Sequence, residues 1–160
     1  MTTISKNEED KKMNQSKDIW RKMLVLAILG GLAFWVTNFA ISLTPIAAEY
    51  RAGLSISYFS MLLEALVGGL IIGFGVSFFL VRFFDKIPTK NPILKSIILS
   101  SIALILFTIF LEVPAKFLTS INDAVHYFLI GILFNVLRIL ALGIVIGYLY
   151  ERFNGHTLHQ

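Results

Sequence analysis

Residues 58–81 read YFSMLLEALVGGLIIGFGVSFFLV, and this stretch decides the fold. It carries a single charged residue, Glu64, and it ends where Arg82 opens a more polar segment. A helix of about 20 mostly apolar residues crosses the roughly 30 Å of hydrocarbon in a bilayer. The stretch therefore predicts a membrane-spanning helix.

Three further segments fit the same description. Residues 23–44 stop at Pro45, residues 93–111 lie between Pro92 and Pro114, and residues 124–150 end before Glu151. In lipid the backbone must satisfy its own hydrogen bonds, so each segment should be α-helical. Connections of about 10–13 residues favour antiparallel neighbours. The sequence thus predicts an all-α integral membrane protein, an antiparallel four-helix bundle.

The composition agrees with this class and excludes several others. Of the 160 residues, 56% are hydrophobic and only 15% charged, whereas a soluble domain has about 25% charged residues. The absence of cysteine excludes disulfides, thiolate metal sites and thiol redox relays, and with them the quinone-linked disulfide oxidoreductases. No phosphate-binding loop or zinc motif occurs, so we expect no cofactor and no metal.

The basic residues predict the topology. Lysines and arginines concentrate in the N-terminal tail, in the connection between the second and third apolar segments, and after the fourth. These residues are Lys6, Lys11, Lys12, Lys17, Arg21 and Lys22, then Arg82, Lys86, Lys90 and Lys95, then Arg152. The other two connections carry only Arg51 and Lys116. The positive-inside rule then predicts that both termini and the middle connection lie in the cytoplasm, and we expect the protein in the cell membrane.

The same charge distribution divides the chain. Residues 1–19 are polar and mixed in charge, which predicts a disordered cytoplasmic tail. Residues 20–152 form the domain of four transmembrane helices, and residues 153–160 form a second cytoplasmic tail. Because the net charge of +4 follows from topology, it does not indicate nucleic-acid binding.

Small residues recur at four-residue spacing on two of the predicted helices. In the second helix they are Ala65, Gly69, Gly73 and Ser77, and in the fourth Gly143 and Gly147. Such faces let helix backbones approach closely in a membrane. We expect them to be helix-packing surfaces, either inside the bundle or between copies of the chain.

Two charged residues lie within the predicted spans. At 1.5 Å per residue, Glu64 lies about 10 Å below the outer membrane boundary and Arg138 about 21 Å below it. A charge at the bilayer centre is costly and normally finds a partner. We therefore predict a Glu64–Arg138 pair, formed directly or through Asn135 or water, with Asn38 and Tyr127 completing a polar cluster.

This cluster has a functional and a structural interpretation. It could be a binding or proton-coupling site open to the outside, or an ion pair that fixes the register of the helices. Glu112, near Pro114, either joins the cluster or marks the membrane interface. His126 lacks the partners of a metal or general-base site.

Three functions follow, in order of support from the sequence. The first is a non-catalytic scaffold, accessory subunit or oligomer, favoured by the glycine faces and the lack of a reaction motif. Its partners would be the lipid bilayer and a second copy or another membrane protein. The alternative is a small transporter or ion-translocating protein that uses Glu64 and Arg138. The third is a membrane enzyme, with Tyr127, His126 and Glu112 as its candidates.

Overall fold

Within the residues that the structure describes, every regular element is a helix. The computed structural model describes residues 2–118 and 122–155, with side chains in 11–118 and 122–154. The long helices are α1 (Thr2–Ser42), α3 (Tyr58–Phe83), α4 (Pro92–Phe107) and α6 (Ala124–Gly155). The short elements are α2 (Pro45–Gly53), a 3₁₀ turn (Phe84–Lys86), a π-helical turn (Thr108–Glu112) and α5 (Val113–Phe117).

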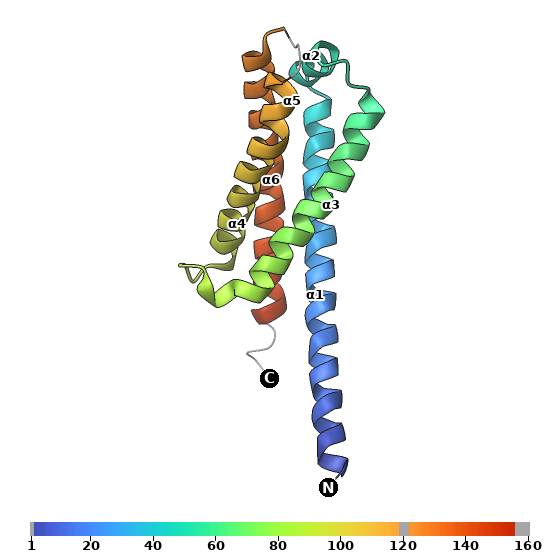
Figure 1. Ribbon diagram of the computed structural model, residues 1–160, viewed down its shortest axis with the longest axis vertical. Coiled ribbons are helices and arrows are strands. Elements are labelled where there is room, and N and C mark those ends of the chain that lie inside the picture. The colour runs from blue at the N-terminus through green and yellow to red at the C-terminus, as the bar shows by residue number, and fades with distance from the viewer. Residues whose placement is uncertain (1, 119–121, 156–160) are drawn as a thin grey trace.

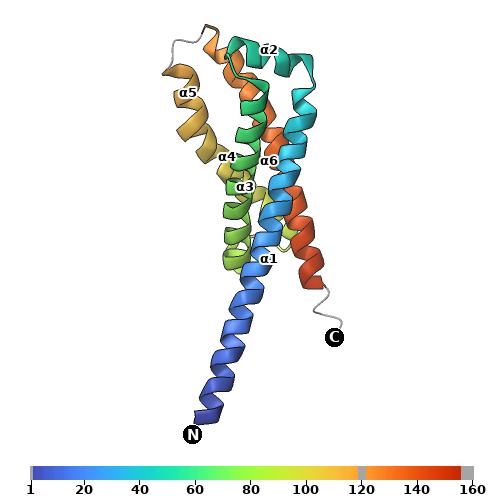
Figure 2. The same cartoon turned by 90° about the vertical axis from the view of Figure 1, so that its right-hand side faces the viewer.

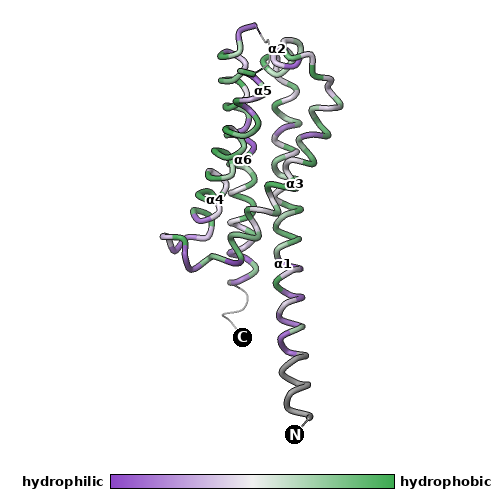
Figure 3. Tube along the Cα trace, viewed as in Figure 1, coloured by the Kyte–Doolittle hydropathy of each residue, from purple (hydrophilic) through white to green (hydrophobic). Residues whose placement is uncertain are grey.

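Four helical stretches are long and apolar enough to cross a membrane. They are Lys11–Ser42, Tyr58–Lys86, Pro92–Phe117 and Ala124–Asn154, with mean hydropathies of 2.1, 2.1, 2.4 and 2.5. In Figure 3 the hydrophobic colouring follows these helices, and the hydrophilic colouring gathers toward their ends. The prediction of four apolar helices is confirmed, and such helices indicate a membrane protein.

The helices form two pairs that lie against one another. α1 packs along α3, and α4 packs along α6, while α6 also contacts α1 (Figures 1 and 2). The start of α1, the end of α6 and the α3–α4 connection lie toward one end of the molecule, here called the terminal end. α2 and α5 lie toward the other, the α2 end. Leu26, Leu80, Leu142 and Ile146 are fully buried in the core.

The helix α1 is longer than the sequence suggests. Its first residue is Thr2, so it continues through the segment for which the sequence predicts disorder. Lysine and glutamate, which are common in this segment, are good helix formers. The first turn of an isolated helix is unfavourable to form, but this segment only extends an apolar helix that already exists. The second tail is also partly helical, because α6 extends to Gly155, and residues 156–160 lie outside the described residues.

A sharp corner joins α1 to α3 at the α2 end. α1 stops at Ser42 and α2 begins at Pro45, where a missing backbone N–H costs nothing. The Thr44 hydroxyl caps α2 by accepting from the Ala47 N–H at 3.3 Å. Arg51 then donates to the Ser42 carbonyl at 3.1 Å, which ties α2 back to the end of α1.

The small residues of α3 lie at its contact with α1. Ala65, Gly69, Gly73 and Ser77 are all buried. A Cβ at position 73 would lie 2.7 Å from the carbonyl oxygen of Ala27, and one at position 69 would lie 3.0 Å from that of Gly31. Glycine is therefore needed here because the two backbones approach closely.

The two glycines of α6 lie at its contact with α4. A Cβ at position 143 would lie 2.8 Å from the Ser100 hydroxyl oxygen, and one at position 147 would meet the Ile93 backbone. Both faces of small residues are thus occupied by neighbouring helices of the same chain. They are not free surfaces for a second copy.

Candidate functional site

A π-helical turn sets the position of Glu112. Pro114 lacks a backbone N–H, and its ring would clash with the carbonyl four residues earlier in a regular helix. The chain accommodates it through the wider turn Thr108–Glu112, after which α5 continues in the helical conformation. The third apolar stretch therefore runs to Phe117, beyond the predicted end at residue 111. Such turns are frequent at functional sites.

The carboxylate of Glu112 is bonded to α6. The Asn135 Nδ2 donates to Glu112 Oε1 at 3.0 Å. One turn further along α6, Arg138 Nη1 donates to Asn135 Oδ1 at 3.1 Å. Because only one orientation of the Asn135 amide satisfies both bonds, this side chain, 3% exposed, links a carboxylate to a guanidinium.

Aromatic rings surround the guanidinium. Its carbon lies 5.9 Å from the ring centre of Phe34 and 5.7 Å from that of Phe134. Phe134 also meets the ring of Tyr50 edge-on at 5.6 Å. These ring faces favour a cation and exclude bulk water from it on two sides.

Tyr50 reaches the same site from α2. A Cβ at position 131 would lie 3.0 Å from Glu112 Oε2 and 3.1 Å from the Tyr50 hydroxyl oxygen, so both groups approach α6 at Gly131. Burial raises the pKa of the Tyr50 phenol, and the charge of Glu112 raises it further. The phenol therefore remains a hydrogen-bond donor. Lys116, 6% exposed, holds its ammonium 5.0 Å from the centre of the Tyr50 ring.

These groups line a cavity of about 380 Å³. One wall is α3, with Glu64 and Gly68; another is the π turn and α5, with Glu112 and Lys116; α6 contributes Asn135 and Arg138. The full set is Phe34, Tyr50, Ile56, Met61, Glu64, Ala65, Gly68, Ile72, Phe107, Leu111, Glu112, Ala115, Lys116, Asn135 and Arg138. The volume lies within the range of small-molecule sites, and the lining combines apolar groups with a few polar ones, as such sites do.

Two buried polar atoms of this site have unused hydrogen-bonding capacity. Within the described part of the chain, neither Glu112 Oε2 nor Arg138 Nε has a hydrogen-bond partner. Nearly all buried polar groups in proteins are hydrogen-bonded, so exceptions need an explanation. A ligand or water in the adjoining cavity would supply the partner.

The predicted cluster is assembled only in part. Glu64 and Arg138 line the same cavity, but the described residues include no direct ion pair between them. Asn135 does bridge Arg138 to a carboxylate, and that carboxylate is Glu112. The prediction compared depths in the bilayer and left Glu112 either in the cluster or at the interface. The π turn and α5 extend this span past Glu112 and bring its carboxylate to Asn135.

Asn38 and Tyr127 lie apart from the cavity. Asn38 is fully buried in α1, and its two side-chain polar atoms have no partner among the described residues. Tyr127 packs its hydroxyl against Gly53 of α2, and its ring lies 6.2 Å from that of Tyr50. Neither residue lines the cavity that holds Glu112 and Arg138.

Sequence reasoning did not find Tyr50, Lys116, Phe34 or Phe134. Lys116 follows Pro114 by two residues, and a lysine within an otherwise apolar run was the available signal. Tyr50 lies in a short helix that the sequence does not distinguish from a loop. The two phenylalanines look like ordinary lipid-facing or core residues.

A separate polar pair lies at the α2 end. His126 Nε2 and Glu49 Oε1 lie 3.2 Å apart on the exposed rim between α6 and α2. Neither His126 nor Tyr127 lines the cavity that holds Glu112, so the three enzyme candidates do not meet in this cavity. Among residues 2–118 and 122–155, no group of three or more His, Cys, Asp or Glu side chains could hold a metal ion.

Comparison with known proteins adds no assignment. No family model, no curated protein and no solved structure matches the chain. Its function must therefore be argued from the site itself.

Proposed function

We propose that the chain is a small solute-binding membrane protein of the transporter kind, with its site in the cavity beside Glu112, Asn135 and Arg138. It would be an antiparallel four-helix bundle of the cell membrane with both termini cytoplasmic, so the cavity would open to the outside. The observation that carries the proposal is the hydrogen-bonded chain Glu112–Asn135–Arg138 in the wall of a cavity of about 380 Å³.

The structure changes the balance between the two leading functions. The scaffold interpretation drew its support from glycine faces, and these faces now contact α1 and α4 of the same chain. The ligand-binding interpretation gains a cavity and a second carboxylate. A purely structural ion pair needs neither a cavity nor buried polar atoms that lack partners.

The charges around the cavity indicate what kind of solute would fit. Glu112 and Arg138 compensate each other through Asn135. Glu64 on one wall and Lys116 on the other make no ion pair or hydrogen bond within the described residues. A small solute with a cationic and an anionic group could satisfy both, one at each wall.

Cysteine accessibility tests the cavity without knowledge of the ligand. The chain has no cysteine, so an introduced thiol is unique. Gly68 and Gly75 are a matched pair on α3, since a Cβ at either position meets no atom within 4 Å, but only Gly68 lines the cavity. A membrane-impermeant thiol reagent outside intact cells should modify Gly68→Cys about tenfold faster than Gly75→Cys, because only a hydrated thiol ionises.

The same variant then identifies the solute. A zwitterion such as betaine that binds should protect Gly68→Cys from modification, and Glu64→Gln or Lys116→Gln should remove the protection. Equal, slow modification of both cysteines would mean a closed cavity and would refute the proposal. Modification of Gly68→Cys only from the cytoplasmic side would refute the orientation.

A scaffold or accessory subunit is the second candidate, because one apolar face has no neighbour among the residues that the structure describes. The third span is the least buried of the four, and Ile102, Ile105, Ile109 and Phe110 are exposed along it. Lipid covers such a face in a monomer, and a partner helix covers it in an assembly. Oxidative cross-linking of Ile105→Cys between copies, absent for Ile71→Cys on α3, would favour the assembly.

A further inference from the structure

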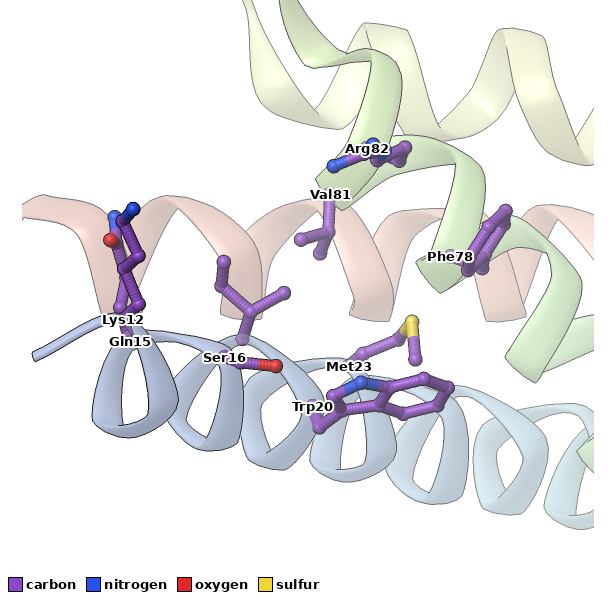
Figure 4. Close-up of a pocket in the computed structure, with 9 residues that line it drawn as sticks. Lys12, Gln15, Ser16, Trp20, Met23, Phe78, Val81 and Arg82 are labelled. Atoms are coloured by element: carbon purple, nitrogen blue, oxygen red, sulfur yellow. The ribbon is translucent and has the colours of Figure 1, made fainter. Parts of the chain in front are cut away.

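A second hollow lies at the terminal end, between α1 and the end of α3. It has a volume of about 680 Å³, and its lining residues are Lys12, Gln15, Ser16, Ile19, Trp20, Met23, Phe78, Val81 and Arg82. Figure 4 shows the side chains of α1 and α3 facing one another across it. We call it the α1–α3 groove. It shares no lining residue with the cavity at Arg138.

The groove changes polarity along its length. The α1 residues follow the spacing of a single helix face and cover about 16 Å from Lys12 to Met23 at 1.5 Å per residue. Lys12, Gln15 and Ser16 form the half further from the core, and Ile19, Trp20 and Met23 form the apolar half. Phe78 and Val81 of α3 continue the apolar half.

The boundary between these halves coincides with the end of the apolar helices. Trp20 stacks on Phe74 with ring centres 6.5 Å apart and is half exposed. Tryptophan side chains gather at the level of lipid headgroups, because one end of the ring is apolar and the other polar. Arg82 closes the apolar run of α3 at the same level. The groove therefore crosses the membrane–water interface.

The charge of the groove has one sign. Lys12 and Arg82 are its charged residues, and none of the described lining residues is acidic. Within the described part of the chain, neither cation belongs to an ion pair. A negatively charged group would therefore be attracted to the polar half.

We propose that the α1–α3 groove binds an anionic phospholipid of the leaflet at the terminal end. Its phosphate would contact Arg82, its headgroup would lie along Ser16, Gln15 and Lys12, and an acyl chain would lie against Trp20, Met23 and Phe78. A free phosphate would leave the apolar half of the groove without a partner. A zwitterionic lipid would place its own cationic group beside Lys12 and Arg82, which would repel it.

Lipid binding to the purified full-length protein tests the assignment. Native mass spectrometry from delipidated detergent solution gives apparent dissociation constants for dioleoyl-phosphatidylglycerol and dioleoyl-phosphatidylcholine. Each basic side chain near a lipid headgroup should contribute about fivefold in affinity. The double variant Lys12→Gln/Arg82→Gln should therefore bind phosphatidylglycerol about 25-fold more weakly than wild type.

The matched control removes two other positive charges from the same end. Lys86 and Arg152 are exposed and do not line the groove, so Lys86→Gln/Arg152→Gln should keep the affinity within about twofold. Lys12 and Arg82 are themselves exposed, so their replacement should leave the helix content and Tm unchanged. Trp20→Ser should also weaken lipid binding, because it removes the largest apolar contact for the acyl chain.

Three results would overturn the proposal. An equal loss in the control variant would show that binding follows the overall charge and not the groove. Equal affinity for phosphatidylcholine would show that the two cations select nothing. Displacement of the lipid by glycerol phosphate at comparable concentration would show that the apolar half contributes nothing.

Discussion

Replacing Asn135 with leucine should cost much more stability than the same change at Asn38. Leucine has the same number of side-chain heavy atoms as asparagine, so packing changes little. At position 135 it removes two hydrogen bonds to charged groups, of 3.0 and 3.1 Å. At about 1–2 kcal/mol per bond in a membrane protein, Asn135→Leu should lower the free energy of unfolding by about 2–4 kcal/mol.

Asn38 is the matched control, since it is equally buried but has no hydrogen-bond partner within the described residues. Replacing an unsatisfied polar group by an apolar one of similar shape is neutral or stabilising. Asn38→Leu should therefore leave the stability unchanged or raise it by about 1 kcal/mol.

The assay is reversible unfolding of the purified protein in mixed micelles with increasing SDS, followed by far-ultraviolet circular dichroism. The result expected is a midpoint shift for Asn135→Leu in the opposite direction to any shift for Asn38→Leu. Equal midpoints for the two variants would refute the reasoning, because the Asn135 amide would then contribute no more than an unpartnered one.

Three further predictions follow from the same structure. The variants Glu112→Gln and Arg138→Gln should be coupled by about 1–2 kcal/mol in a double-mutant cycle of unfolding free energies, because one amide joins the two charges; additive effects would contradict the hydrogen-bonded chain. Gly73→Ala should destabilise by about 1–3 kcal/mol, because its Cβ would lie 2.7 Å from a carbonyl oxygen of α1. Gly75→Ala is the control: its Cβ would meet open space, so it should be neutral or stabilising by up to about 1 kcal/mol. Similar SDS unfolding midpoints for Gly73→Ala and Gly75→Ala would contradict the close contact between Gly73 and α1. The difference in unfolding free energy between wild type and Tyr50→Phe should be constant below about pH 10, the ordinary pKa of the phenol. Above that pH the wild type should lose stability relative to the variant, as measured by SDS unfolding at a series of pH values. Burial raises the pKa of the folded phenol, so the unfolded phenol loses its proton first; a difference that stays constant would contradict this.

The sequence predicted the four apolar helices. The majority of their predicted ends lie within a few residues of the observed ends. Hydrophobic length and the positions of Pro45 and Pro92 carry that information, and both prolines begin helices in the structure. It did not predict the length of α1, because a polar segment that is weakly helical alone becomes helical when it continues an apolar helix.

The partner of Arg138 was harder to predict. The sequence placed Arg138 and Asn135 on one face, and both line the cavity. Its choice of Glu64 as the partner compared depths in the bilayer, and the predicted end of the third span at residue 111 left Glu112 at the edge of the cluster. The turn Thr108–Glu112 contains one residue more than an α-helical turn, which rotates later side chains by about 100° relative to a regular helix. No periodicity argument reveals such a turn in advance.

The glycine faces illustrate a different limit. Four-residue spacing located the residues at Gly69, Gly73, Gly143 and Gly147, and all four lie at close helix contacts. Spacing alone could not say whether the neighbour belongs to the same chain, because close approach needs small residues in either case. Only the arrangement of α1 against α3 and of α4 against α6 assigns the neighbours.

The bond between Asn135 and Glu112 also bears on how the chain enters the bilayer during synthesis. An arginine near the centre of a helix adds an unfavourable 2.5–3.5 kcal/mol, roughly, when that helix inserts alone. Here the compensating carboxylate lies on the preceding span, so the two groups belong to one helical hairpin. The two helices can therefore leave the translocon together, with Glu112 and Arg138 already connected through Asn135. A carboxylate on the second span would instead enter the lipid before its partner is synthesised. The hairpin of the third and fourth spans therefore brings the arginine and its carboxylate into the bilayer together.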